Sequence, residues 1–307
     1  MNKEKSMVSV ILYLGDAPQE SWDFLKKVCA EVESVFEHYE IVAVNDSRQN
    51  TADYVREQYR ESGMRAALTL VNLSVRQGVE RAMNAGIDIA IGDYLYEFDN
   101  IHAGLPEGIV EQAFRRSTEG YDIVTAMPEG SEQGTSRLFY RIFNRFSHSG
   151  GKVGTDGMHL LSRRAVNRLH AINSYIPYRK AAYAASGLKT ATVNYKPVTP
   201  FRSVDDDRVG KAMDALILYT DAAYRLSLFI AFFMLAVALI AGIYTLVIYL
   251  SMKPVAGWTT TMVLSSAGFS GTFLLFAIVI KYLSLLVDLI FHNQKYLVAS
   301  VDKVQNE

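Results

Sequence analysis

The chain has a single cysteine, Cys29, among its 307 residues, which excludes an intramolecular disulfide framework. It also lacks a large charge of either sign, because the formal net charge at pH 7 is −1. A chain of this charge has no general attraction to nucleic acid, and we expect no nucleic-acid partner. Residues 1–16 hold only a short apolar run that ends in Gly15 and Asp16. We expect a β-strand there, not a secretory signal peptide.

Charged residues are missing from two long stretches of the C-terminal third. The first runs from Leu226 to Leu250 and the second from Met262 to Ile280, about 25 and 19 residues in length. A helix needs about 20 apolar residues to cross the hydrocarbon of a bilayer. Two buried helices of a soluble core are the alternative, but such helices rarely run this long without a charge. We therefore expect two transmembrane helices.

The basic residues that flank the two runs predict their orientation. Arg208, Lys211 and Arg225 precede the first run, and Lys295 follows the second. The linker between the runs holds only Lys253. Because basic residues are enriched on the cytoplasmic side, we expect a multi-pass protein of the inner (cytoplasmic) membrane. Its large N-terminal domain is expected to be cytoplasmic.

The N-terminal two thirds of the chain alternate between strand-like and helix-like segments. The predicted strands cover residues 8–14, 40–46, 66–73 and 93–99, and the predicted helices cover residues 21–36, 51–62 and 78–90. This alternation predicts an α/β domain with a mostly parallel sheet. Ligands of such sheets bind beyond the carboxyl ends of the strands, where Asp46 and Asp99 both fall. Either acid alone is also an ordinary turn residue, but together they suggest a site.

These patterns divide the chain into four parts. We expect the α/β domain at residues 1–200, a juxtamembrane linker with an interfacial helix at 201–225, a two-helix transmembrane hairpin at 226–292 and a cytoplasmic C-terminal tail at 293–307. Residues 136–147 have apolar side chains on one helical face and arginines on another, a pattern typical of a helix in the membrane interface. An ordinary amphipathic core helix is the alternative.

Several segments follow one another in a specific order. They read VSVILYL, VNDSRQNTAD, LSVRQG, NAGIDIAIGDY, HLLSRRAV, GWTT between the apolar runs, and NQKYLV near the end. In this order the chain resembles family 2 glycosyltransferases of the polyprenyl-phosphate type, such as dolichol-phosphate mannose synthases and bactoprenol glucosyltransferases. The resemblance covers nearly the whole chain.

The resemblance implies a fold and a reaction. The fold is a Rossmann-like, nucleotide-sugar-binding domain of the GT-A type. The donor is a nucleotide-diphosphate sugar, with a UDP-linked sugar as the first expectation. The acceptor is a polyprenyl (undecaprenyl) phosphate, transfer inverts the anomeric carbon, and a divalent metal, Mg²⁺ or Mn²⁺, is held through a DxD motif. Enzymes of this kind serve cell-envelope polysaccharide assembly and O-antigen modification.

By the same resemblance, four residues are expected at the nucleotide. Asp46 is placed against the base or ribose, and the backbone near Tyr13 and Leu14 forms the other wall. The alternative for Asp46 is to cap the following helix. Arg76 is placed near the diphosphate, with a solvated loop arginine as its alternative.

Two acids are the candidates for the chemistry. Asp99 lies where the family begins its DxD motif and is the expected metal ligand, although Ile101 stands in place of the second acid. Asp156 is the candidate catalytic carboxylate, although Gly157 stands at the family's own position and an Asp-Gly turn is an equal alternative. A lipid phosphate is already ionised near neutral pH, so positioning matters more than a strong base.

A loop beyond the α/β domain supplies the last two candidates. Arg202 and Arg208 are the basic residues of the segment that closes over the donor diphosphate in the family. The leading hypothesis is therefore a membrane-anchored inverting glycosyltransferase. Its alternative is a catalytically silent relative that acts as a binding or scaffold subunit in glycan assembly. A processive polysaccharide synthase is disfavoured because two spans provide little for a polymer channel, and a homo-oligomer is left open.

Overall fold

The structure is a computed structural model that describes residues 3–130, 141, 154–172, 178–201 and 296–304, and scattered positions between 229 and 286. The chain divides into two compact units. One consists of Met1–Ala212 with Gln294–Glu307, and the other is Met213–Asn293. The predicted interfacial helix at 136–147, apart from Arg141, lies outside the described residues, as does the segment 202–228.

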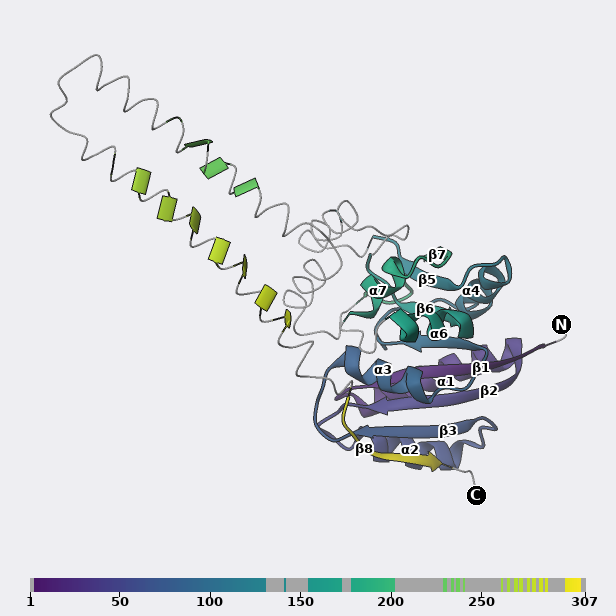
Figure 1. Cartoon of the computed structure of the whole chain (residues 1–307). Coiled ribbons are helices and arrows are strands. Elements are labelled where there is room, and N and C mark those ends of the chain that lie inside the picture. The colour runs from purple at the N-terminus through teal and green to yellow at the C-terminus, as the bar shows by residue number, and fades with distance from the viewer. Residues whose placement is uncertain are drawn as a thin grey trace, which may run out of the picture. The chain divides into compact units, whose positions relative to one another are not determined.

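The first unit is built on one eight-stranded sheet with the order β7-β5-β6-β4-β1-β2-β3-β8 (Figure 1). The strands are β1 (Glu4–Leu14), β2 (Phe36–Asn45), β3 (Ala67–Leu73), β4 (Tyr94–Phe98), β5 (Ile123–Pro128), β6 (Met158–Ser162), β7 (Thr190–Tyr195) and β8 (Val298–Val304). Strands β3, β2, β1 and β4 are parallel, and β5 is parallel to β7. Strand β6 runs antiparallel to β4 and β5, and β8 runs antiparallel to β3. The sheet is therefore mixed, with a parallel centre.

Helices cover the sheet and follow the strands that lead into them. They are α1 (Pro18–Val35), α2 (Thr51–Ser62), α3 (Val79–Ile89), α4 (Ile109–Thr118), α6 (Arg163–Ile172) and α7 (Arg179–Ala185). Val10 and Leu12 of β1 belong to a core that includes residues of α1, α2 and α4. Ile11 meets α3, where a Cβ on Gly86 would lie 2.5 Å from its Cγ2 atom. This close approach favours glycine, because an added methyl group would overlap the Ile11 side chain.

The predicted alternation of strands and helices is confirmed. The helix expected at 51–62 is α2 with the same bounds, and the four expected strands correspond to β1 to β4. Strand β1 begins at Glu4, earlier than its apolar run, because its pairing with β2 extends to Phe36. Burial on both faces explains why these strands read as continuous apolar runs.

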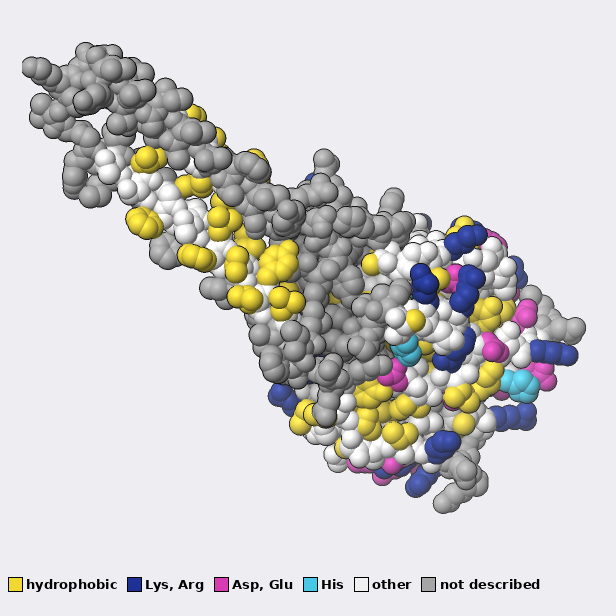
Figure 2. Space-filling model, in the orientation of Figure 1, with side chains coloured by type: hydrophobic (Ala, Val, Ile, Leu, Met, Phe, Trp, Pro, Cys, Tyr) yellow, Lys and Arg dark blue, Asp and Glu magenta, His cyan; other side chains and the backbone are white. Residues whose placement is uncertain are grey.

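The second unit is described only at scattered positions, which are helical. Large apolar side chains are exposed at Phe229, Phe233, Ile240, Phe269, Phe276, Val279, Leu283 and Leu286. Figure 2 shows apolar side chains exposed along the described part of this unit. Within the part of the chain that the structure describes, no helix combines the length and hydrophobicity of a bilayer crossing. The two transmembrane helices therefore stay a prediction.

The C-terminal segment contributes a strand that the sequence analysis did not foresee. Strand β8 pairs with β3 from Leu68 opposite Val304 to Leu73 opposite Val298, and Figure 1 shows the two strands side by side. Asp302 of β8 also accepts a 2.7 Å hydrogen bond from Arg56 of α2. The chain thus leaves the first unit for the second and returns to it.

Candidate functional site

Asp46 organises the carboxyl ends of β1 and β2. Its Oδ1 atom accepts a hydrogen bond from the backbone N–H of Gln77 at 2.6 Å, and Oδ2 accepts one from that of Gly78 at 2.9 Å. The hydroxyl of Tyr13 donates a third at 3.1 Å, and the carbonyl of Leu14 accepts one from the Asp46 backbone at 3.0 Å. Asp46 is 3% exposed, so its carboxylate anchors the loop between β3 and α3.

The anchored loop carries Arg76 at the same edge of the sheet. The Arg76 side chain is 36% exposed, and its guanidinium lies 3.5 Å from Asp16. Gly78, which precedes α3, has a φ of 86°, a conformation that favours glycine. The loop is thus held in a shape that keeps Arg76 partly open to solvent.

The loop between β3 and α3 also forms hydrogen bonds with Leu297, in the segment that follows the second unit. The side-chain amide of Gln77 donates to the Leu297 carbonyl at 2.7 Å, and its carbonyl accepts from the Leu297 backbone N–H at 2.8 Å. The backbone N–H of Ser74 also donates to the Leu297 carbonyl, at 3.0 Å. Leu297 immediately precedes β8, so the segment before β8 supports the loop between β3 and α3.

Asp99, the predicted metal ligand, accepts a 3.0 Å hydrogen bond from a buried arginine. That arginine, Arg179 of α7, also donates to Glu80 of α3 at 3.0 Å and to Glu97 of β4 at 2.7 Å. The Arg179 side chain is 1% exposed, and those of Glu80, Glu97 and Asp99 are 9%, 0% and 11% exposed. Three carboxylates from different parts of the chain therefore converge on one guanidinium.

Burial and the neighbouring charges together set the pKa values in this cluster. Burial raises the pKa of Glu97 above its ordinary value of 4.5, against the opposing effect of Arg179. Burial opposes the charge of Arg179, but Glu80 and Glu97 outweigh it and raise the pKa of the guanidinium well above its ordinary value. The hydroxyl of Tyr183 donates a further 2.6 Å hydrogen bond to Glu97. Arg179 is therefore a permanent positive charge beside Asp99.

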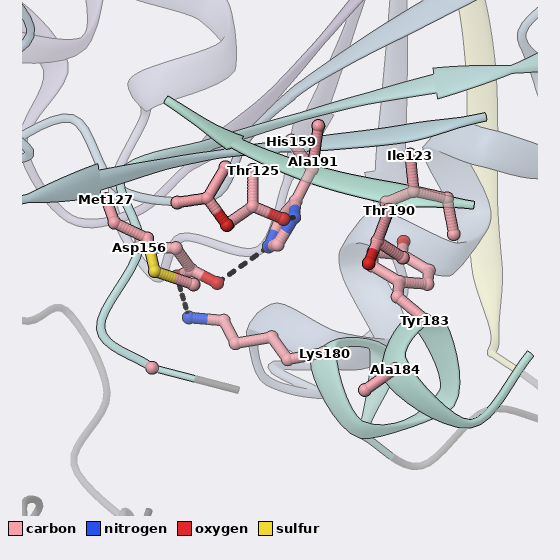
Figure 3. Close-up of a pocket in the computed structure, with 12 residues that line it drawn as sticks. Ile123, Thr125, Met127, Asp156, His159, Lys180, Tyr183, Ala184, Thr190 and Ala191 are labelled. Carbon is pink, nitrogen blue, oxygen red and sulfur yellow. Dashed lines mark hydrogen bonds and ion pairs between the residues drawn. The ribbon is translucent and has the colours of Figure 1, made fainter. Parts of the chain in front are cut away.

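Asp156, the predicted catalytic carboxylate, is held by two basic side chains (Figure 3). Lys180 of α7 contacts its Oδ1 atom, and the Nε2 atom of His159 lies 2.7 Å from its Oδ2 atom. The other ring nitrogen of His159 lies 3.1 Å from the Thr125 hydroxyl. Burial alone would raise the pKa of Asp156, but Lys180 and His159 outweigh it and hold the pKa below its ordinary value. A carboxylate in this state is a weak proton acceptor.

The cavity beside Asp156 is small. It has a volume of about 30 Å³ and is lined by residues of β5, β6, β7 and α7, among them Met127 and Tyr183. Such a space holds about one or two water molecules. A ligand much larger than water does not fit this cavity.

The structure brings some predicted residues together and leaves others aside. Tyr13, Leu14 and Asp46 form one hydrogen-bonded group, and Arg76 lies on the loop that this group anchors. Asp99 and Asp156 are linked through consecutive residues of α7. Arg202 and Arg208 lie outside the described residues.

Several residues of the site were missed by the sequence analysis. They are Glu80, Glu97, His159, Arg179, Lys180 and Tyr183. Glu97 carried the only local signal, a charged residue inside an otherwise apolar strand. Its partner Arg179 lies 82 positions further along the chain, which no local pattern connects to it.

The described residues do not fit a resident divalent metal ion. Among them, no group of three or more His, Cys, Asp or Glu side chains is arranged to hold a metal. Ile101 replaces the second acid of the motif, and one oxygen of Asp99 already accepts from Arg179. His102 lies 3.4 Å from Glu20 and is a poor ligand for a hard cation. Among the described residues of this site, Asp99 is the one candidate ligand, and Arg179 already occupies one of its oxygens.

The mixed α/β sheet, with acids and an arginine at the carboxyl ends of its parallel strands, is consistent with a nucleotide-sugar-binding domain of the GT-A type. The family model for glycosyl transferase family 2 matches residues 19–182. The chain belongs to this family, as the sequence resemblance predicted.

Two known proteins give the family match more detail. An uncharacterized glycosyltransferase of Synechocystis sp. is 28% identical over 162 residues, 50% of each chain. An undecaprenyl-phosphate 4-deoxy-4-formamido-L-arabinose transferase of Edwardsiella ictaluri is 26% identical over 194 residues, 59% of this chain and 58% of the relative. The chain thus spans about half the length of the curated relatives it matches.

A solved structure shares the fold. The mannosyltransferase of Pyrobaculum calidifontis, in complex with GDP-Man and Mn²⁺, superposes with a TM-score of 0.51 at 16% identity. The match covers 72% of this chain and 65% of the mannosyltransferase. At this identity the likeness concerns the fold alone.

Proposed function

We propose that the protein transfers a sugar from a nucleotide-diphosphate donor to a polyprenyl phosphate at the cytoplasmic face of the membrane. A phosphate oxygen of the lipid forms a new bond to the anomeric carbon. The bond from that carbon to the diphosphate oxygen breaks, and the nucleoside diphosphate leaves with the electron pair. Attack from the opposite face inverts the anomeric centre, and an ionised acceptor phosphate has no proton to lose.

One observation carries the donor half of this proposal. Tyr13, Asp46 and Asp99 all stand at the carboxyl ends of the parallel strands β1, β2 and β4, where α/β sheets bind their ligands. Because the carboxylate of Asp46 is buried against Gln77 and Gly78, its part in nucleotide binding is to hold the loop in place. Arg76 on that loop is the residue suited to the diphosphate, because a guanidinium matches phosphate oxygens.

The acceptor half rests on the second unit. Its described residues are uncharged, and many expose large apolar side chains, which is unusual for a surface in water. Both ends of this unit connect to the same α/β unit, because β8 returns to the sheet. A membrane segment with this connectivity crosses an even number of times, in agreement with a hairpin of two spans. The Edwardsiella relative, by its name, acts on undecaprenyl phosphate.

The two acids then have different tasks. Asp99 faces the donor diphosphate, and a Mg²⁺ or Mn²⁺ ion brought with that diphosphate would neutralise the leaving charge. Asp156 is held ionised and orients groups around the acceptor without taking a proton. Arg202 and Arg208 lie outside the described residues, and their proposed contact with the donor diphosphate rests on the sequence resemblance alone. The catalytic domain works in the cytoplasm, where nucleotide sugars are available. Experiment must identify the sugar and the base of the donor, and whether the protein is a homo-oligomer.

The test is transfer from a panel of radiolabelled nucleotide sugars to undecaprenyl phosphate by the full chain in detergent. Parallel reactions contain Mg²⁺, Mn²⁺ or EDTA. We expect one labelled lipid whose sugar identifies the donor. No labelled lipid from any donor, by protein that still binds UDP, would reject the enzyme and favour the silent scaffold subunit.

A further inference from the structure

Arg179 contacts Asp99, the acid that stands at the start of the family's DxD motif. It is 1% exposed, so solvent and a donor do not reach it directly. It nevertheless contacts Asp99 at 3.0 Å, and the same guanidinium contacts Glu80 and Glu97. A buried arginine with three carboxylate partners is a fixed part of the fold, because its removal would leave buried carboxylates without this counter-charge.

We propose that Arg179 is a built-in cation that occupies Asp99 and weakens divalent-metal binding at the end of β4, so that a metal enters only with the donor diphosphate. The inference rests on the proposed function for its meaning in catalysis, but not for its test. Arg179 is a positioning residue in this view. It holds the Asp99 carboxylate by one oxygen and cancels part of the negative charge that a metal would need.

The charge balance supports this role. Without Arg179, the carboxylates of Glu80, Glu97 and Asp99 would share one buried region with no counter-charge from this arginine. Carboxylates so placed either take up protons or attract a cation. With Arg179 present, the cluster already has a cation with hydrogen-bonding geometry, and a hard metal ion must compete with it.

The experiment measures Mn²⁺ binding to the full chain in detergent, from the electron paramagnetic resonance signal of free Mn²⁺. Wild type is compared with Arg179→Gln, first without nucleotide and then with UDP. We expect Arg179→Gln to bind Mn²⁺ at least about tenfold more tightly than wild type without nucleotide. The double variant Arg179→Gln, Asp99→Asn should lose that gain. UDP should strengthen Mn²⁺ binding to wild type more than to Arg179→Gln.

Arg164→Gln is the matched control, because Arg164 pairs with Asp122, away from Asp99, and should leave Mn²⁺ binding unchanged. If Arg179→Gln does not fold, Arg179→Lys decides, since a lysine cannot hold three carboxylates and should still tighten Mn²⁺ binding. A folded Arg179 variant with wild-type Mn²⁺ affinity would overturn the proposal. Failure of sugar transfer would not, because no step of this test depends on turnover.

Discussion

Arg179 and Lys180 are consecutive residues at the start of α7, yet each holds a different acid of the candidate site. Arg179 donates to Asp99 at 3.0 Å, and Lys180 contacts Asp156. Asp99 follows β4 and Asp156 precedes β6, strands that are neighbours in the sheet. A short helix therefore sets the distance and orientation between the two carboxylates, and a change in α7 should affect both.

Asp99→Asn should lower sugar transfer at least about 100-fold, because a neutral amide cannot stabilise a diphosphate-bound cation as a carboxylate does. The fold should survive, since Arg179 keeps Glu80 and Glu97 as partners. The measurement is the rate of labelled lipid formation together with the melting temperature. Asp53→Asn, at an exposed acid that pairs with Arg56, is the control and should keep full activity. Full activity of Asp99→Asn would remove Asp99 from the reaction.

Lys180→Met should destabilise the protein by about 3 kcal/mol, because it leaves the buried Asp156 without its main counter-charge. Lys26→Met, at an exposed pair with Asp23, should cost less than about 0.5 kcal/mol. Chemical denaturation of both variants in detergent makes the comparison. The double variant Lys180→Met, Asp156→Asn should recover part of the loss, and an additive result would show that the two residues are not coupled.

Gln77→Ala should raise the KM for the donor about fivefold and leave kcat nearly unchanged. It removes two hydrogen bonds to Leu297 that support the loop between β3 and α3, which carries Arg76. Each hydrogen bond is worth about 1 kcal/mol. Gln112→Ala on α4, outside the site, is the control. Steady-state kinetics over a range of donor concentrations separates the two constants. A fall in kcat at unchanged KM would contradict a role of the loop in donor binding.

Acid should destabilise the protein partly through Asp122. The hydrogen bond from Arg164 holds the pKa of Asp122 below its ordinary value of 3.8. Because the folded pKa is the lower one, this stabilisation is complete above pH 3.8 and is lost as the pH falls toward the folded value. Melting temperatures of wild type and Arg164→Gln should therefore differ near neutral pH and converge at acid pH. A constant difference would contradict the assignment.

The fold of the first unit was largely predictable because its information is local. The apolar run from Val8 to Leu14 and the helical spacing at residues 51–62 identify β1 and α2 without knowledge of neighbours. Strand β8 was not predictable in this way. Residues 298–304 alternate only weakly between buried and exposed positions, and their partner β3 lies more than 200 residues earlier in the chain.

The residues of the candidate site also fall into two groups, those that a local sequence pattern indicates and those that only tertiary contacts bring together. Asp46 and Asp99 could be proposed from sequence because parallel strands carry ligands at their carboxyl ends, and the position after a strand can be read from a local pattern. The surroundings of Asp99 could not be found, because Glu80, Glu97 and Arg179 lie far apart along the chain. Local periodicity is enough to establish the α/β alternation and to predict two apolar spans. Only long-range packing decides which cation each acid meets, since the burial that makes such a pair obligatory exists only in the folded sheet.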